Sequence, residues 1–183
     1  FTTRCSSSPW SKPESAKMPE MYNQLVLNFE SMKDRPKAVS QLEEFQGICN
    51  PNNKWARSQK RRLGEEIETA KTNNRGSADE DPRLSPVQKC RSLFQETSLM
   101  LASKWLRLWK KNQNFPIFAD VAEKAFALYL EHANSTQKAR RARFAYAELL
   151  FQRKKYRLAS QQYALVKPDQ NDGEDLFHDA SYA

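Results

Sequence analysis

Residue types that could catalyse a reaction or bind a metal occur in this chain, but not at the spacing that such chemistry needs. Glu65 and Glu66 could supply carboxylates for acid–base catalysis, yet the basic run 60–62 beside them is typical of surface ion pairs. The histidines, His132 and His178, are too far apart in the sequence to form a recognisable zinc motif. The sequence contains no glycine-rich phosphate loop and no nucleophile motif. We therefore expect a non-enzymatic protein without a cofactor or a metal.

The chain contains three cysteines, Cys5, Cys49 and Cys90, and no Cys-x-x-Cys pair. An odd number of cysteines does not form a complete disulfide framework. Cys49 and Cys90 fall on the apolar stripes of expected helices, where a free cysteine behaves as a small hydrophobic residue. We therefore interpret both as buried thiols.

The N-terminal segment 1–19 is rich in serine and proline and lacks periodic apolar residues, so we expect a disordered tether. Because the chain begins at Phe1, we expect a processed chain or a fragment. Cys5, followed by three serines and a proline, resembles the start of a mature bacterial lipoprotein, in which this cysteine is lipidated. Residues 1–8 contain arginine and serine but no acid, which is also typical of an organellar transit peptide. An ordinary disordered end is the third interpretation.

Length and composition exclude several classes of protein. With 183 residues, the chain is long enough for one domain with a hydrophobic core. Hydrophobic residues make up 39% and charged residues 28%, a balance that excludes collagen-like and silk-like sequences. The longest apolar run, residues 125–130, is far shorter than the roughly 20 residues that cross a bilayer. Helix-forming residues dominate, so we predict an all-α fold of antiparallel helical hairpins.

The net charge of +8 is distributed unevenly along the chain. Residues 82–115 include seven basic residues and one acidic residue, and residues 116–166 include nine basic and four acidic residues. The C-terminal segment 167–183 is instead acidic, with one basic and five acidic residues. A basic surface attracts phosphate, anionic lipid headgroups or an acidic protein. A solvated helix face is the simpler interpretation of the same charges.

Apolar residues recur at helical spacing along most of the chain. The pattern predicts helices at about 20–34, 36–49, 54–72, 85–111, 117–133, 136–152 and 155–166. The helix at 136–152 carries two apolar rows, so we expect it to pack on two sides.

The polar segment 73–84 is the expected boundary between two lobes. Residues 20–72 would form an N-terminal helical hairpin followed by a polar helix, and residues 85–166 a second helical domain. Residues 167–183 are expected to form an acidic loop and the start of a truncated helix.

An internal repeat links three of the expected helices. Each has an alanine followed four positions later by a bulky apolar residue, and the pairs are Ala38 with Leu42, Ala122 with Phe126, and Ala159 with Tyr163. Alanine lets two helices approach closely, and the bulky residue one turn later fills the gap. Tyr146 and Ala147 are the expected contact residues of the helix that precedes the third pair.

The repeat resembles the tetratricopeptide repeat (TPR) family. The best-matched stretch is 139–166, in which the family's packing signature would be Ala147, Tyr156, Ala159 and Tyr163. The resemblance covers residues 117–166 well and residues 20–51 in part. It implies that the hairpins stack as a short TPR-like solenoid.

One junction resembles a particular branch of this family. Tyr129 and Leu130 end one helix, and residues 139–148 then match the opening of the next helix in bacterial cell-envelope members. Those members include outer-membrane assembly lipoproteins and periplasmic division coordinators. The resemblance implies that partners are other protein subunits of an envelope complex.

Two surfaces are candidates for binding a partner. The first is a basic edge at the last two helices, made of Arg140, Arg141, Arg143, Arg153, Lys154 and Arg157. The second is the indole pair Trp105 and Trp109, which lie one helical turn apart among lysines and arginines and could dock a protein or a lipid surface. In the alternative interpretation, one indole fills the core and the cations are solvated.

These observations predict a non-enzymatic helical-repeat scaffold that mediates protein–protein interactions in a cell-envelope complex, with possible membrane association. The expected location is the bacterial periplasm or cell envelope. The alternative is a basic helical protein that binds RNA or a ribosome, in a mitochondrion or another organelle. Nucleic acid is a partner only in this second interpretation.

Overall fold

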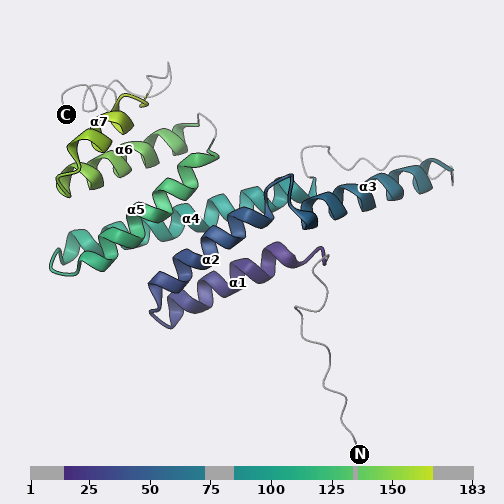
Figure 1. The fold of residues 1–183 in the computed structure, drawn as a ribbon, viewed down its shortest axis with the longest axis horizontal. Coiled ribbons are helices and arrows are strands. Elements are labelled where there is room, and N and C mark those ends of the chain that lie inside the picture. The colour runs from purple at the N-terminus through teal and green to yellow at the C-terminus, as the bar shows by residue number, and fades with distance from the viewer. Residues whose placement is uncertain (1–14, 73–84, 134–135, 167–183) are drawn as a thin grey trace, which may run out of the picture.

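The structure is a computed structural model that describes residues 15–72, 85–133 and 136–166. Within these residues every regular element is a helix, which confirms the predicted all-α fold (Figure 1). The helices are α1 (Met18–Ser31), α2 (Arg35–Ile48), α3 (Lys54–Thr72), α4 (Pro86–Lys111), α5 (Pro116–Glu131), α6 (Gln137–Gln152) and α7 (Tyr156–Tyr163). Their bounds lie within a few residues of the predicted ones.

Prolines and polar caps determine where several helices begin. Proline stands in the first turn of α1, α2, α4 and α5, where its missing N–H would have no partner within the helix. At α4, the Ser85 hydroxyl accepts from the Gln88 backbone N–H, and the Gln88 side chain accepts from the Ser85 N–H. This capping box starts the longest helix of the described chain.

Six of the helices form three antiparallel hairpins, α1–α2, α4–α5 and α6–α7. The hairpins pack in series, because α2 contacts both α4 and α5, and α5 contacts α6. The three turns that close the hairpins lie on the same side of the molecule, at the left of Figure 1. The described helices therefore form the stack of helical hairpins that the sequence predicts.

The first and last hairpins have the same turn geometry. After α1, the Asp34 N–H donates to the Phe29 carbonyl at 2.9 Å, and after α6, the Lys155 N–H donates to the Leu150 carbonyl at 2.9 Å. These bonds are those of the Schellman motif, in which the residue after the cap is left-handed and usually glycine. Here it is lysine in both turns, Lys33 with φ 62° and Lys154 with φ 59°.

One continuous core joins helices on both sides of residues 73–84. Its largest fully buried side chains come from α2, α4 and α5, and they include Phe45, Phe94, Trp105 and Phe126. The segment 73–84 itself lies outside the described residues. The helices before and after it share a core, so the expected boundary does not separate two independently packed lobes.

Helix α6 packs on two sides, as predicted. Ala142 and Leu149 belong to the main core, whereas Ala147 and Leu150 form a second cluster with Ala159 of α7. Helix α6 therefore joins α7 to the rest of the stack.

The repeat residues occupy equivalent positions in the hairpins. Ala38, Ala122 and Ala159 lie in the second helix of their hairpins and are at most 1% exposed. Their bulky partners are also buried. Of the two expected contact residues in α6, Ala147 is completely buried and Tyr146 is partly buried. Tyr156 is an exception. We expected it to belong to the packing signature, but its side chain is 55% exposed because it begins α7 at the hairpin turn.

A buried carboxylate connects three helices in the core. Among the described residues, Glu30 is the charged residue that is buried, and its oxygens face α4 and α2. It accepts a hydrogen bond from the Trp105 indole at 2.9 Å and forms an ion pair with Lys104 at 2.8 Å. The Arg35 Nε lies 4.0 Å from the same carboxylate. A buried charge is tolerated when it has such partners, so this cluster favours one arrangement of α1, α2 and α4.

We expect Glu30→Ala to lower the free energy of unfolding by about 3 kcal/mol, because the buried Trp105 N–H loses its acceptor and two cations lose a counter-charge. Glu30→Gln retains an acceptor and should cost roughly half as much. Denaturant unfolding measures both variants. Glu96→Ala, which removes an exposed carboxylate from α4, is the control and should change stability by less than about 0.5 kcal/mol. Equal effects of Glu30→Ala and Glu96→Ala would contradict a structural role for the cluster.

Candidate interaction surfaces

The basic edge predicted from the sequence divides into exposed and internally bound residues. Arg141, Lys154 and Arg157 are exposed. Arg140 and Arg143 are half-buried, and the Arg143 guanidinium donates to the Gln162 side chain at 2.9 Å. Arg140 also has an intramolecular interaction partner. The exposed members are therefore the ones that can contact another molecule without breaking a contact within the fold.

Arg153 connects the last hairpin to α5. Its guanidinium donates to Glu123 at 2.5 Å and to Asp120, and Lys155 donates to the same Glu123 at 2.7 Å. Arg153 is mostly covered, because its side chain is 20% exposed. We predicted that Arg153 binds a partner, but the structure places it in an ion-pair network that fixes the α6–α7 turn against α5.

The indole pair does not form a surface patch. Trp105 is completely buried and Trp109 is 7% exposed, because both lie on the face of α4 that packs into the core. The prediction that they dock a protein or a lipid surface is therefore wrong for this fold. Neighbouring cations on the same helix, Arg107, Lys110 and Lys111, are exposed.

Cys49 and Cys90 form a disulfide bond, so their interpretation as free thiols is wrong. Cys49 follows α2 and Cys90 lies near the start of α4, and both are buried as predicted, at 3% and 0% exposure. The odd number of cysteines concealed this pair, because the spacing of three cysteines does not identify which two meet in space. Cys5, the candidate lipidation site, lies outside the described residues.

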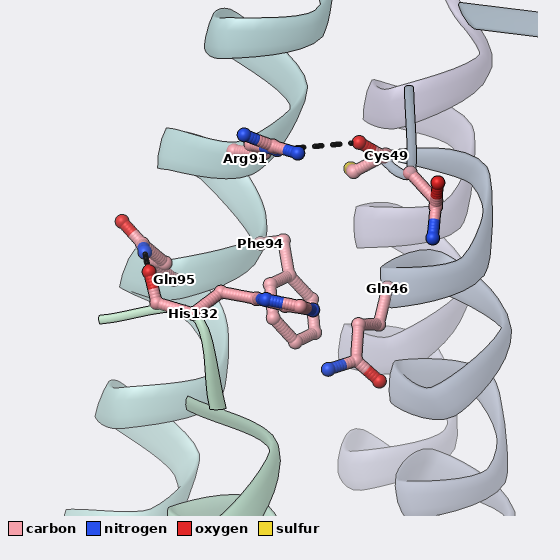
Figure 2. A pocket seen from close by; sticks show the side chains of 7 residues that line it. Gln46, Cys49, Arg91, Phe94, Gln95 and His132 are labelled. Carbon is pink, nitrogen blue, oxygen red and sulfur yellow. Dashed lines mark hydrogen bonds between the residues drawn. The ribbon is translucent and has the colours of Figure 1, made fainter. Parts of the chain in front are cut away.

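A shallow pocket lies beside this disulfide between α2, α4 and the end of α5 (Figure 2). Its rim is polar, with Arg91 donating to the Cys49 carbonyl at 3.4 Å and Gln95 donating to the His132 carbonyl at 2.9 Å. Phe94 forms its floor. The pocket leaves about 20 Å³ free, which is room for about one water molecule and not for an organic ligand.

We expect reduction of the Cys49–Cys90 bond to lower the free energy of unfolding by about 4 kcal/mol, because the bond closes a loop between residues 41 positions apart. Denaturant unfolding with and without dithiothreitol measures the difference. The double variant Cys49→Ala/Cys90→Ala is the control, and its stability should not respond to the reductant. A wild-type chain that is equally stable in both conditions would contradict the pairing.

The contact between α6 and α7 includes a buried tyrosine. The Tyr163 hydroxyl donates to the Glu148 carboxylate, and its ring packs edge-to-face on Phe144 with centroids 5.7 Å apart. Burial raises the pKa of Tyr163 well above its usual 10.0, and the hydrogen bond and negative charge of Glu148 raise it further. The neutral tyrosine is therefore the form that holds α7 on α6.

This pKa shift predicts a loss of stability at alkaline pH. Because the pKa of Tyr163 is raised in the folded state, its stabilising contribution is complete below pH 10.0 and is lost as the pH rises above that value. Tyr163→Phe removes the ionisation and keeps most of the ring packing. The free energy of unfolding, measured at pH values above 10.0, should therefore fall less steeply with pH for Tyr163→Phe than for the wild type. Parallel curves for the two proteins would contradict the assignment.

Sequence reasoning missed the exposed apolar residues. Apart from Met100 in the middle of α4, they lie at the hairpin turns, on α7 and in the turn after it. They include Met32, Phe115, Ile117, Phe151, Leu158 and Leu165, each between 38% and 72% exposed. A search for apolar residues beside the expected helix ends, off the periodic stripe, could have found them.

In the described ranges, no group of His, Cys, Asp and Glu side chains could hold a metal ion. No helix in these ranges has both the length and the apolar content needed to span a bilayer.

No family model matches the chain, and neither a curated protein nor a solved structure matches it.

Proposed function

We propose that this chain is a non-enzymatic helical-hairpin scaffold that binds a protein partner in a cell-envelope complex. The observation that carries the proposal is the outer side of α7, which ends the described stack with exposed leucines. The relation to TPR proteins remains a prediction from the repeat, and it supports the same kind of role.

Helix α7 and the turn after it have one buried side and one exposed apolar side. Ala159, Tyr163 and Val166 are at most 4% exposed where they face the stack, whereas Leu158 and Leu165 are 46% and 51% exposed. Leu158 lies in α7 and Leu165 in the turn after it, seven positions later, which is close to two helical turns. The N–H groups of Leu165 and Val166 still bond three residues back, so the chain keeps turning there, and Leu165 follows Leu158 along the exposed side while Val166 follows Ala159 along the buried side. In a stack of helical hairpins, an apolar face of this kind is covered by the next helix.

We propose an amphipathic helix with acidic flanks as the occupant of this face. Its apolar side would cover Leu158 and Leu165, in the manner of a helix that lies against a hydrophobic surface. Charge complementarity argues for acidic flanks, because Arg141 and Arg157 are exposed and no acidic residue occurs between Glu148 and Asp169. Arginine binds carboxylates through two parallel hydrogen bonds, which would fix the orientation of the docked helix.

The disulfide supports a cell-envelope location for this scaffold. Buried structural disulfides form and persist in oxidising compartments such as the bacterial periplasm, and they are rare in the cytosol. The Cys49–Cys90 bond lies in the core and joins α2 to α4, so its loss would affect the whole stack. An oxidising compartment therefore suits this fold.

The test is site-specific photo-crosslinking in the native cells. A photoreactive residue at position 158 is expected to capture an envelope protein through an acidic amphipathic helix, and a photoreactive residue at the exposed position 100 serves as the control. The captured helix, made as a peptide, should bind the purified chain. Leu158→Ser/Leu165→Ser should weaken this binding by about 10- to 100-fold, because two apolar side chains lose their burial. Met100→Ser should leave it unchanged.

Two outcomes would contradict the proposal. Crosslinks from position 158 to residues 167–183 of the same chain would show that the acidic C-terminal segment covers this face. Capture that disappears after nuclease treatment would favour the RNA-binding interpretation instead.

A further inference from the structure

A second surface is formed by the three turns that close the hairpins. Each turn exposes at least one large apolar side chain, and we call this set, Met32, Phe115, Ile117, Phe151 and Tyr156, the turn edge. Met32 is at the α1–α2 turn, Phe115 and Ile117 are at the α4–α5 turn, and Phe151 and Tyr156 are at the α6–α7 turn. Residues far apart in the sequence thus present the same chemistry on one side of the molecule (Figure 1).

Contacts between neighbouring hairpins hold the three turns in place along this edge. The Arg35 guanidinium lies 4.6 Å from the ring centre of Phe118, which joins the first turn to the second. Phe118 also packs edge-to-face on Phe115. The ion pairs of Arg153 with Asp120 and Glu123 then join the third turn to α5.

The apolar side chains of the turn edge are not covered by one another. Phe151 and Tyr156 pack edge-to-face with centroids 5.3 Å apart, yet they remain 43% and 55% exposed. Met32, at 72%, is the most exposed large hydrophobic residue of the described chain. Exposed apolar side chains gathered on one side mark an interaction site more often than scattered ones do.

The charge along the turn edge is positive. Lys33, Lys110, Lys111 and Lys154 are exposed there, and none of them forms an ion pair with the described residues. The carboxylates at the same turns are already neutralised: Asp34 pairs with Lys37 at 2.9 Å, and Asp120 and Glu123 pair with Arg153. The unpaired charge that remains on this edge is therefore cationic.

Two of these lysines occupy positions where glycine would be favoured. Lys33 and Lys154 have left-handed backbones, with φ 62° and 59°, in which the side chain of any residue except glycine crowds the backbone. Both stand at the turn positions of their hairpins and are exposed. Lysine at these positions costs backbone energy that glycine would avoid, and this cost is consistent with a use for the charge.

We propose that the turn edge binds the surface of an anionic lipid membrane. Its apolar side chains stand apart on three separate turns, and a bilayer interface accommodates such protrusions, whereas a protein partner would need a matching cavity for each. Lysines beside them would pair with lipid phosphates. This proposal does not rest on the partner-binding function of α7, because it uses different side chains.

Vesicle flotation with the full chain tests the proposal. We expect binding to vesicles of phosphatidylcholine with phosphatidylglycerol, much weaker binding to phosphatidylcholine alone, and weaker binding at high salt. Lys33→Gly/Lys154→Gly should reduce the affinity about 30-fold by removing two surface charges. Because glycine suits both left-handed positions, this variant should unfold at the same or a higher denaturant concentration, so a loss of binding cannot be due to misfolding.

The matched control removes the same charge from the opposite end of the fold. Lys60→Ala/Lys89→Ala, on the exposed surfaces of α3 and α4, should retain nearly wild-type binding. For the apolar part, Met32→Ser/Phe115→Ser should weaken binding at least about tenfold, and Met100→Ser should have little effect.

Three results would overturn the proposal. One is the absence of binding to anionic vesicles by the wild-type chain. Another is an equal loss for Lys33→Gly/Lys154→Gly and for the control pair, which would indicate attraction by overall charge. The third is that the chain binds a short RNA but not vesicles, and that Lys33→Gly/Lys154→Gly weakens the RNA binding. The turn edge would then recognise nucleic acid.

Discussion

The arrangement of helices α1, α2 and α4 depends on the interactions of one buried carboxylate, that of Glu30. Apolar packing has no strong directional preference, so it permits neighbouring helices to slide or rotate by small amounts. A buried carboxylate removes this freedom, since any shift that breaks its bonds to Trp105 and Lys104 leaves a charge and an indole N–H without partners. The disulfide adds a covalent constraint between α2 and α4 at the other end of α2. Together, the two contacts fix the helices that support the rest of the stack.

The helices could be predicted from the sequence because their signals are local. Prolines mark four of the starts, and alanines such as Ala38 and Ala159 mark close helix contacts in the second helix of each hairpin. The two apolar rows at residues 136–152 likewise predicted the two packing partners of α6. Each of these features is determined by residues within one or two helical turns, so the tertiary structure does not need to be known.

The candidate sites were less predictable because they depend on contacts between distant residues. Arg153 and Lys154 are adjacent and equally basic, but Arg153 meets carboxylates about 30 positions earlier in the chain, whereas Lys154 remains exposed. The indoles of Trp105 and Trp109 could not be assigned to core or surface, because α4 carries apolar residues around more than half of its circumference. Cysteine pairing depends in the same way on which helices approach, and composition does not contain that information.

The hairpin architecture explains why one side of the molecule gathers similar side chains. In a series of antiparallel hairpins, every turn lies on the same side, so positions separated by more than a hundred residues lie along one edge. None of these positions belongs to the buried core, and polar residues or glycine would satisfy the turns at lower cost. The three turns differ in sequence, and the middle one lacks the Schellman geometry of the other two, yet all expose an apolar side chain beside lysine. A feature common to turns of different construction is not a by-product of turn geometry, and a surface role explains why it occurs at all three.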